Sequence, residues 1–183
     1  ATLLMPFNAT GLTANKNNMD FYSGVLMAVS DLESRGIEIE LNVHDIAANQ
    51  QNIPYEYTSG SDVIIGPVSS KDLNTLLSAG NQLPMVVSPL DPRAEKLVAG
   101  YTNMIQAPTP YRIQYEDLME WIKEELMPQD RVLLITEKGA RQTEASVQIK
   151  AAVDSSGLSY KTFSYSILEG RDVMTPLKEL MTA

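Results

Sequence analysis

Short apolar runs alternate along the whole chain with longer stretches in which apolar residues recur every three or four positions. This alternation is typical of βαβ units and predicts a mostly parallel sheet with helices on both faces. The runs predicted as strands are 3–7, 39–46, 63–65, 85–88, 103–106, 131–136 and 160–167. The stretches predicted as helices are 19–35, 69–81, 110–126, 142–155 and 173–181. The segments 47–57 and 89–100 are expected to be loops, the first with at most a short helix.

Two of these helices have apolar stripes that we expect to face the core. Ser69 begins a third helix, because Asp72 follows three residues later in the arrangement of a capping box. In the helix over 19–35 the stripe is Phe21, Tyr22, Val25, Leu26, Val29 and Leu32. In the helix over 110–126 it is Ile113, Leu118, Trp121, Ile122 and Leu126.

The order of elements indicates two lobes. Residues 1–110 form a first α/β lobe, 111–130 a crossing helix and hinge, and 131–183 a partial second α/β lobe. Two strands with two helices rarely bury enough apolar area alone. We therefore expect the chain to be a piece of a longer protein, with uncovered apolar surface in 131–183. That surface would lead either to pairing with another chain, including self-association, or to mobility.

Composition narrows the class of partner. The 183 residues are 44% apolar and 20% charged, as in a packed globular protein. The formal charge is -9, divided as -6 over residues 1–110 and -3 over 111–183. This charge disfavours nucleic acid and anionic membrane surfaces as partners, because proteins bind both through clusters of Lys and Arg side chains. The sequence also has no apolar run long enough to cross a bilayer.

Motifs for catalysis, metals and cofactors are missing from the sequence. With no cysteine and only one histidine, the chain lacks the ligands of a zinc site. The loop after the first strand has a single glycine, Gly11, so it does not match a dinucleotide-binding turn. His44 and Asp45 are adjacent on a predicted strand and so point to opposite faces, which disfavours a catalytic pair. We therefore predict no catalytic residue, no metal, no cofactor and no enzymatic activity.

The candidate site is positional. In an open parallel sheet, ligands bind outside the carboxyl ends of the strands. Ser69 and Ser70 stand there at a helix N-terminus, where free N–H groups favour a carboxylate, although Ser69 could simply cap the helix. The predicted ligand-binding residues are Asn8, Ser69, Ser70, Ser88 and Asp91.

Several segments together resemble the type I periplasmic ligand-binding proteins, the leucine/isoleucine/valine-binding family with its receptor relatives. They are 3–7 (LLMPF), 20–29 (DFYSGVLMAV), 43–45 (VHD), 62–70 (DVIIGPVSS) and 83–89 (LPMVVSP). The resemblance implies two α/β lobes that close on a small ligand without covalent chemistry and deliver it to a membrane partner, as in ABC transport. It further implies an extracytoplasmic, periplasmic location in bacteria, and it matches Ser69 or Ser70 to a serine that holds an amino acid's carboxylate.

One stretch departs from the family pattern. After Ser88-Pro89 the family commonly has small residues and a threonine, whereas this chain has Leu90, Asp91, Pro92 and Arg93. A carboxylate at Asp91 would repel a ligand carboxylate nearby. The sequence also resembles divergent members associated with cell-wall-binding LysM modules, and more distantly lipoprotein activators of peptidoglycan synthases. Two hypotheses follow: a module that binds an amino-acid-like or cell-wall-derived small ligand, and a cell-wall-associated protein-interaction platform with a degenerate cleft.

Overall fold

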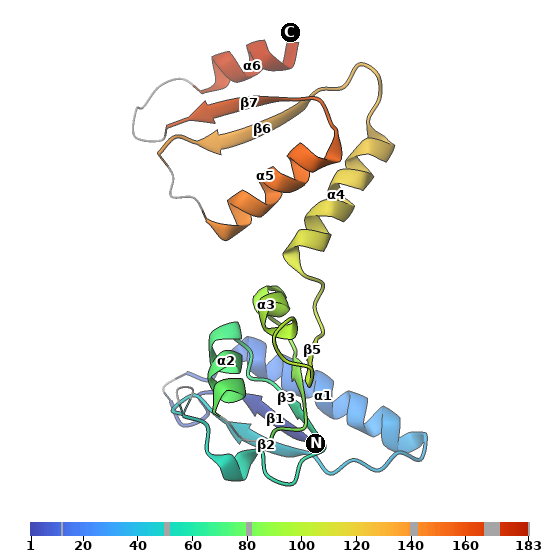
Figure 1. Ribbon diagram of the computed structural model, residues 1–183, viewed down its shortest axis with the longest axis vertical. Helices are drawn as coiled ribbons and strands as arrows, with labels where there is room; N and C mark the ends of the chain where they lie inside the picture. The colour runs from blue at the N-terminus through green and yellow to red at the C-terminus, as the bar shows by residue number, and fades with distance from the viewer. Residues whose placement is uncertain (12, 50–51, 80–81, 140–142, 167–172, 183) are drawn as a thin grey trace. The chain divides into compact units, whose positions relative to one another are not determined.

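The computed structural model describes residues 1–183 apart from 12, 50–51, 80–81, 140–142, 167–172 and 183 (Figure 1). It divides into two compact units, Ala1–Pro110 and Tyr111–Ala183. The strands are β1 (Thr2–Met5), β2 (Asn42–Asp45), β3 (Val63–Ile65), β4 (Met85–Ser88), β5 (Met104–Gln106), β6 (Val132–Glu137) and β7 (Tyr160–Tyr165). The α-helices are α1 (Lys16–Ser34), α2 (Ser70–Ser78), α3 (Glu95–Val98), α4 (Tyr111–Glu125), α5 (Glu144–Ser156) and α6 (Met174–Thr182). Short 3₁₀ turns, η1 (Tyr55–Tyr57) and η2 (Pro92–Ala94), complete the described elements.

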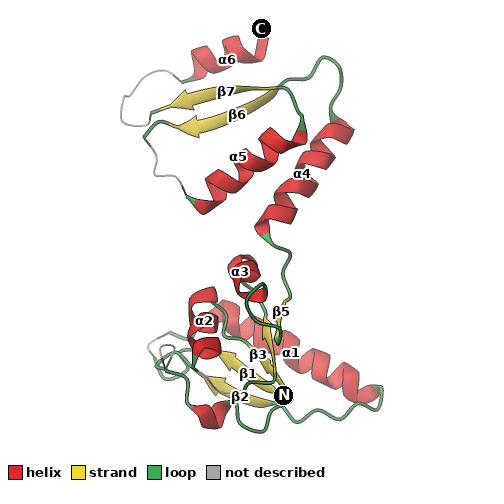
Figure 2. Ribbon diagram, viewed as in Figure 1, coloured by secondary structure: helices red, strands yellow, loops and turns green. Residues whose placement is uncertain are grey.

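The first unit is an α/β structure built on a five-stranded parallel sheet in the order β2-β1-β3-β4-β5 (Figure 2). Its three central strands, β1, β3 and β4, are short and mostly apolar, as expected for a parallel sheet with helices on its faces, whereas the edge strand β2 is mostly polar. The prediction of an α/β fold with a parallel first-lobe sheet is therefore confirmed.

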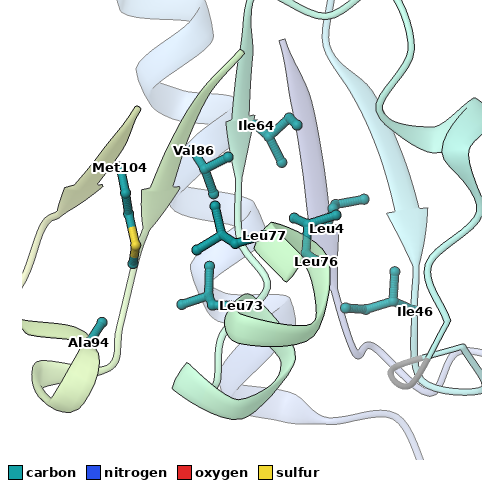
Figure 3. Packing of buried hydrophobic residues seen from close by; sticks show 9 residues of the cluster. All are labelled: Leu4, Ile46, Ile64, Leu73, Leu76, Leu77, Val86, Ala94 and Met104. Carbon is teal, nitrogen blue, oxygen red and sulfur yellow. The ribbon is translucent and has the colours of Figure 1, made fainter. Parts of the chain in front are cut away.

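Two apolar clusters lie on the two faces of this sheet because neighbouring strand residues point to opposite sides. On one face, Leu4, Ile64 and Val86 pack with Leu73, Leu76 and Leu77 of α2 (Figure 3). On the other, Leu3 and Met5 pack against Phe21, Tyr22 and Val25 of α1. Each face is thus organised around one principal helix.

The second unit pairs β6 with β7 in parallel and packs α4 against α5. Met119 of α4 and Ala152 and Val153 of α5 form its buried cluster, and Tyr160 at the start of β7 packs against it. The expectation of uncovered apolar surface is confirmed in this unit, since Ile135 is 50% and Val147 51% exposed. Pairing of this surface with another chain stays a prediction.

The seven predicted strands and five predicted helices are all present in the expected order, with ends shifted by a few residues. The loop prediction for 89–100 is wrong, because η2 and the four-residue helix α3 lie there, too short to give a periodic signal. Three core predictions are also wrong. Leu126, 38% exposed, lies beyond the end of α4, and within the helices Leu26 is 45% and Trp121 60% exposed. Leu26 and Trp121 each lie about 100° around the helix from the face that packs, which a broad apolar stripe does not distinguish.

Gly66, directly after β3, lies so close to the backbone of β1 that a side chain has no room there. Its φ is +98°, and a Cβ at this position would lie 2.2 Å from the carbonyl oxygen of Leu4. Its N–H also donates to the carbonyl of Val87 at 2.8 Å. Only glycine satisfies both the backbone angle and the space, so this residue fixes how the chain leaves β3 toward α2.

We predict that Gly66→Ala lowers the free energy of unfolding by about 3 kcal/mol, because the new methyl combines a forbidden φ with a backbone clash. The matched control is Gly24→Ala in the middle of α1, where a Cβ meets nothing within 4 Å. That control should leave stability unchanged or raise it by up to about 1 kcal/mol through helix propensity. Urea unfolding followed by circular dichroism measures both, and equal stability of the two variants would contradict the prediction.

Candidate functional site

The carboxyl ends of the parallel strands in the first unit carry the five predicted site residues. Asn8 follows β1, Ser69 and Ser70 follow β3, and Ser88 and Asp91 lie at and after the end of β4. Since the strands are parallel, these residues all stand at one edge of the sheet. We call this edge, with the loops that follow β1 to β5, the rim.

Ser69 acts as the N-cap of α2. Its backbone is extended, with φ -87° and ψ 144°, and its Oγ accepts a hydrogen bond from the N–H of Asp72 at 3.1 Å. The same hydroxyl donates to the Asp72 carboxylate at 2.7 Å. The prediction that Ser69 caps the helix is confirmed, and its O–H donor is used within the cap.

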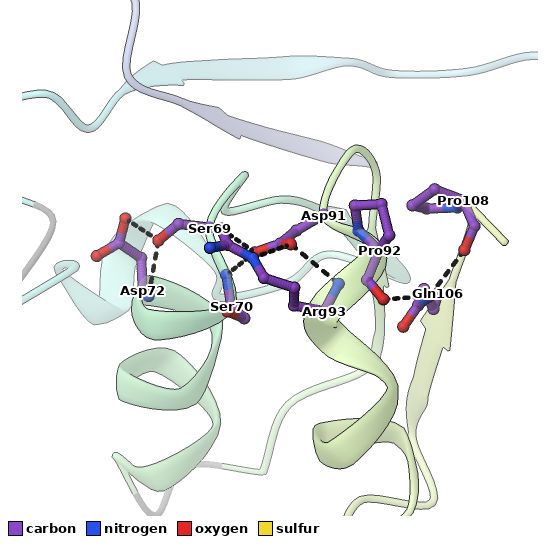
Figure 4. Close-up of polar contacts among 8 residues, drawn as sticks. All are labelled: Ser69, Ser70, Asp72, Asp91, Pro92, Arg93, Gln106 and Pro108. Atoms are coloured by element: carbon purple, nitrogen blue, oxygen red, sulfur yellow. Dashed lines mark hydrogen bonds and ion pairs between the residues drawn. The ribbon is translucent and has the colours of Figure 1, made fainter. Parts of the chain in front are cut away.

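Asp91 occupies the anion position at the start of α2 (Figure 4). One carboxylate oxygen accepts from the backbone N–H of Ser70 at 2.8 Å. Arg93 donates from its backbone N–H at 3.0 Å, its Nε at 2.9 Å and its Nη2 at 3.2 Å. The Asp91 side chain is only 5% exposed, and these partners keep a buried carboxylate satisfied.

These contacts set the ionisation of Asp91. Burial raises the pKa of its carboxyl, but the hydrogen bonds from the side chain and backbone of Arg93 and from Ser70 outweigh that effect. The pKa therefore falls from 3.8 to about 2. Asp91 is therefore a carboxylate at neutral pH, and its negative charge lies favourably at the helix N-terminus.

A second carboxylate, that of Asp45, accepts hydrogen bonds from backbone N–H groups in the loops after β1 and β2. Asp45, at the end of β2, accepts from the backbone N–H groups of Asn8 at 3.2 Å, Ala9 at 2.8 Å and Ala47 at 3.0 Å. Partial burial raises the pKa of Asp45, and these N–H donors lower it by more, so that it lies below 3.8. Asn8 has φ +56°, and its Nδ2 donates to the carbonyl of Thr13 at 2.9 Å.

Ser88 and Gln106 form the third part of the rim. They are register partners on β4 and β5, and Ser88 is fully buried. Gln106 donates through Nε2 to the carbonyls of Pro92 at 3.3 Å and Pro108 at 2.7 Å. The Oγ of Ser88 and the Oε1 of Gln106 are buried with no hydrogen-bond partner. These two atoms retain hydrogen-bonding capacity that the chain itself does not use.

The structure brings Ser70 and Asp91 into direct contact, with Ser69 beside them, whereas Asn8 bonds to Asp45. Sequence reasoning places Arg93 and Gln106 in loops of the rim without naming them as binding residues, and it misses Asp45. Asp45 is the last residue of β2 and Gln106 the last residue of β5, so position at a strand end was a usable signal. The direction of the Arg93 side chain had no signal in sequence.

His44 contributes to packing. Its ring stacks on Tyr57 with centroids 4.1 Å apart and an interplanar angle of 10°. Asp45 is turned to the backbone donors described above, so it does not orient the His44 ring. Across the described part of the chain, no group of three His, Asp or Glu side chains is placed to hold a metal ion. None of the described helices is long and apolar enough to cross a membrane.

No protein-family model matches the sequence, and a search of curated proteins finds no significant match.

We predict that Asp91→Asn lowers the free energy of unfolding by about 1–2 kcal/mol at pH 7, a value reduced for solvent screening on the exposed Arg93 side. The amide cannot accept from all the donors that face it. Because the folded-state pKa of Asp91 is depressed, its stabilisation is present above pH 3.8 and is lost as the pH falls toward 2. The difference between wild type and variant should therefore shrink over that window.

Urea unfolding at pH 7, 4 and 2.5 measures this difference. Asp62→Asn, at an exposed carboxylate beside β3, is the matched control and should give a difference near zero at each pH. An Asp91→Asn variant as stable as wild type at pH 7 would show that the Asp91 contacts do not support the rim.

Proposed function

We propose that this chain is a non-enzymatic, extracytoplasmic binding module with the architecture of the type I periplasmic-binding class, and that it serves as a protein-interaction platform at the cell wall. The parallel sheet order of the first unit is compatible with that class, and the sequence segments described above resemble it. The proposal concerns bacteria, because the resemblance is to bacterial envelope proteins.

The carboxylate of Asp91 is the observation that carries the proposal. In the family that the sequence resembles, a serine at the position of Ser69 or Ser70 holds the carboxylate of an amino-acid ligand. Here the N–H of Ser70 is bonded to Asp91, and the Ser69 hydroxyl is bonded to Asp72. A ligand carboxylate entering this position would find these donors already occupied, and it would be repelled by the negative charge of Asp91. The rim is therefore poorly suited to amino acids and better suited to a partner that does not depend on an anion site.

Small-ligand capture is the second candidate, favoured by Ser88 and Gln106. Their buried, unpartnered oxygens could accept hydrogen bonds from a small neutral or cationic ligand. Such a ligand would approach from the side of β4 and β5 and would leave Asp91 in place. This alternative differs from amino-acid binding in that it needs no ligand carboxylate.

We predict that the chain of residues 1–183 gives no saturable heat with leucine, alanine, glutamate or arginine, so that any dissociation constant is weaker than about 1 mM. Isothermal titration calorimetry measures this directly. Saturable binding of any of these amino acids would overturn the platform proposal in favour of solute capture. Binding of a neutral or cationic cell-wall fragment, lost in Ser88→Ala, would support the second candidate.

Removing Asp91 tests the physical basis of the proposal. In Asp91→Ala the Ser70 N–H loses its carboxylate acceptor, and added acetate should shift the Ser70 amide resonance in a saturable manner. Wild type and Asp62→Ala should show no such shift. Equal acetate response in wild type would mean that Asp91 does not exclude external carboxylates.

A crosslinker at the rim tests the platform itself. Leu90 is 43% exposed beside Asp91, and a photoreactive residue there should yield a discrete protein adduct when the chain is expressed in a bacterial envelope. The same residue at Met27, which is 74% exposed on α1, serves as the control. Identical, diffuse adducts from both positions would count against a rim-specific partner.

A further inference from the structure

One face of the first-unit sheet is covered at its centre and open over β4 and β5. A single row of register partners crosses this face: Val43, Leu3, Ile65, Val87 and Ile105. Leu3, beneath α1, is fully buried, Ile65 and Val87 are half-buried, and Ile105 is 48% exposed. Met85, two residues before Val87 on the same side of β4, is 37% exposed. We call Met85, Val87 and Ile105 the β4–β5 strip.

None of the described parts of the connections within the first unit covers this strip. The segment between β3 and β4 forms α2, and the segment between β4 and β5 contains η2 and α3. Leu73 of α2 and Ala94 of η2 belong to the cluster on the opposite face (Figure 3). This is the side required by right-handed crossovers that progress from β3 to β5. The α1 connection runs the other way, from β1 to β2, and packs on Leu3, Met5 and Ile65. A cover for the strip must come from outside residues 1–110.

The dimensions of the strip suit one helix. Two neighbouring strands span about 10 Å, which is the diameter of a helix with its side chains. Helices are also the elements that cover the faces of parallel sheets. The strip and the segments around it, 82–90 and 99–110, contain no charged residue. An apolar helix face would therefore meet no buried charge there.

The sheet face that carries α1 is acidic overall. On the face that carries α1, Lys16 and Arg35 are the only bases between residues 1 and 45, and Arg35 is paired with Asp31 at 2.8 Å. The acids of α1 and of the link from α1 to β2 are Asp20, Asp31, Glu33, Glu38 and Glu40. The remaining bases of the unit, Lys71, Arg93 and Lys96, belong to α2, η2 and α3 on the opposite face. A partner with positive charge outside its apolar stripe would be drawn to this face.

We propose that the β4–β5 strip docks an amphipathic helix of another protein, one that carries an apolar stripe flanked by lysine or arginine. This surface lies on the sheet face and is separate from the rim of the proposed function. A second copy of the chain does not fit the description, since none of its described helices has a net positive charge and each copy carries -9. Two acidic faces brought together would repel each other.

The test uses the full chain of residues 1–183 and synthetic peptides of about 18 residues, long enough for a stable amphipathic helix on docking. The first peptide has a leucine and alanine stripe with lysine elsewhere. The second replaces every lysine with glutamate, and the third has the composition of the first in an order that breaks the stripe. Fluorescence anisotropy should show saturable binding of the first peptide alone.

Two neutral variants locate the binding surface. Ile105→Gln and Met85→Gln each should weaken binding of the lysine peptide by about tenfold, because each removes apolar contact without changing charge. Met27→Gln, at an apolar residue of α1 that is 74% exposed, is the matched control and should change binding by less than about twofold. Thermal unfolding checks that all three variants are folded.

The proposal is overturned if the lysine peptide fails to bind, if the control weakens binding as much as the strip variants, or if the glutamate peptide binds equally well. Sedimentation of the chain as a dimer that Ile105→Gln dissociates would assign the strip to a second copy. A photoreactive residue at Ile105 that crosslinks within one chain to residues 111–182 would assign it to the second unit. None of these results bears on the amino-acid titrations at the rim, so the two proposals fail separately.

Discussion

The contact between the Asp91 carboxylate and the N–H of Ser70 determines what the rim can do. A carboxylate that is 5% exposed is stable only when its oxygens are satisfied, and Ser70 and Arg93 supply the donors. The same contact joins the start of α2 to the loop after β4, two segments about 20 residues apart in sequence. It therefore supports the fold and at the same time removes the free donors that would make the helix N-terminus a site for external anions.

Asp45 extends this arrangement across the sheet. Its carboxylate accepts from three backbone N–H groups around β1 and β2, and its pKa, like that of Asp91, is lowered. Loops at the carboxyl ends of parallel strands generally present unpaired N–H groups to a ligand. In this chain two internal carboxylates satisfy them instead. Two buried side-chain groups in the described part of the rim are left without a partner: the Ser88 hydroxyl, which can donate or accept a hydrogen bond, and the Oε1 of Gln106, which can accept one.

The sequence predicted the parallel sheet well, because strands such as 3–5 and 63–65 are buried on both faces and are therefore apolar at every position. Residues near the rim could be predicted because strand ends mark it. The contacts of the side chains at the rim could not be predicted. From sequence alone Asp91 could equally face solvent, repel a ligand or bond to Ser70, and only the distance between the loop after β4 and the start of α2 decides among these. The sequence analysis expected Asp91 to lie near the anion position at the start of α2 and to repel a ligand carboxylate there. In the structure Asp91 itself occupies that position, bonded to the N–H of Ser70. Leu26 and Trp121 were misplaced for a related reason, since periodicity defines an apolar half of a helix and only packing selects the part that is buried.

Strand β4 connects the rim and the β4–β5 strip. Val87 points to the strip, while the next residue, Ser88, points to the opposite face and begins the loop that carries Asp91. A helix docked on the strip would restrain Val87, and through one peptide unit it would restrain the backbone that places Ser88 and Asp91. Hydrogen bonds also hold β4 from the side of the rim. Asp91 accepts from the N–H of Ser70 in α2, and the carbonyl of Val87 accepts from the N–H of Gly66. The two surfaces are chemically distinct, and they share one short strand, β4.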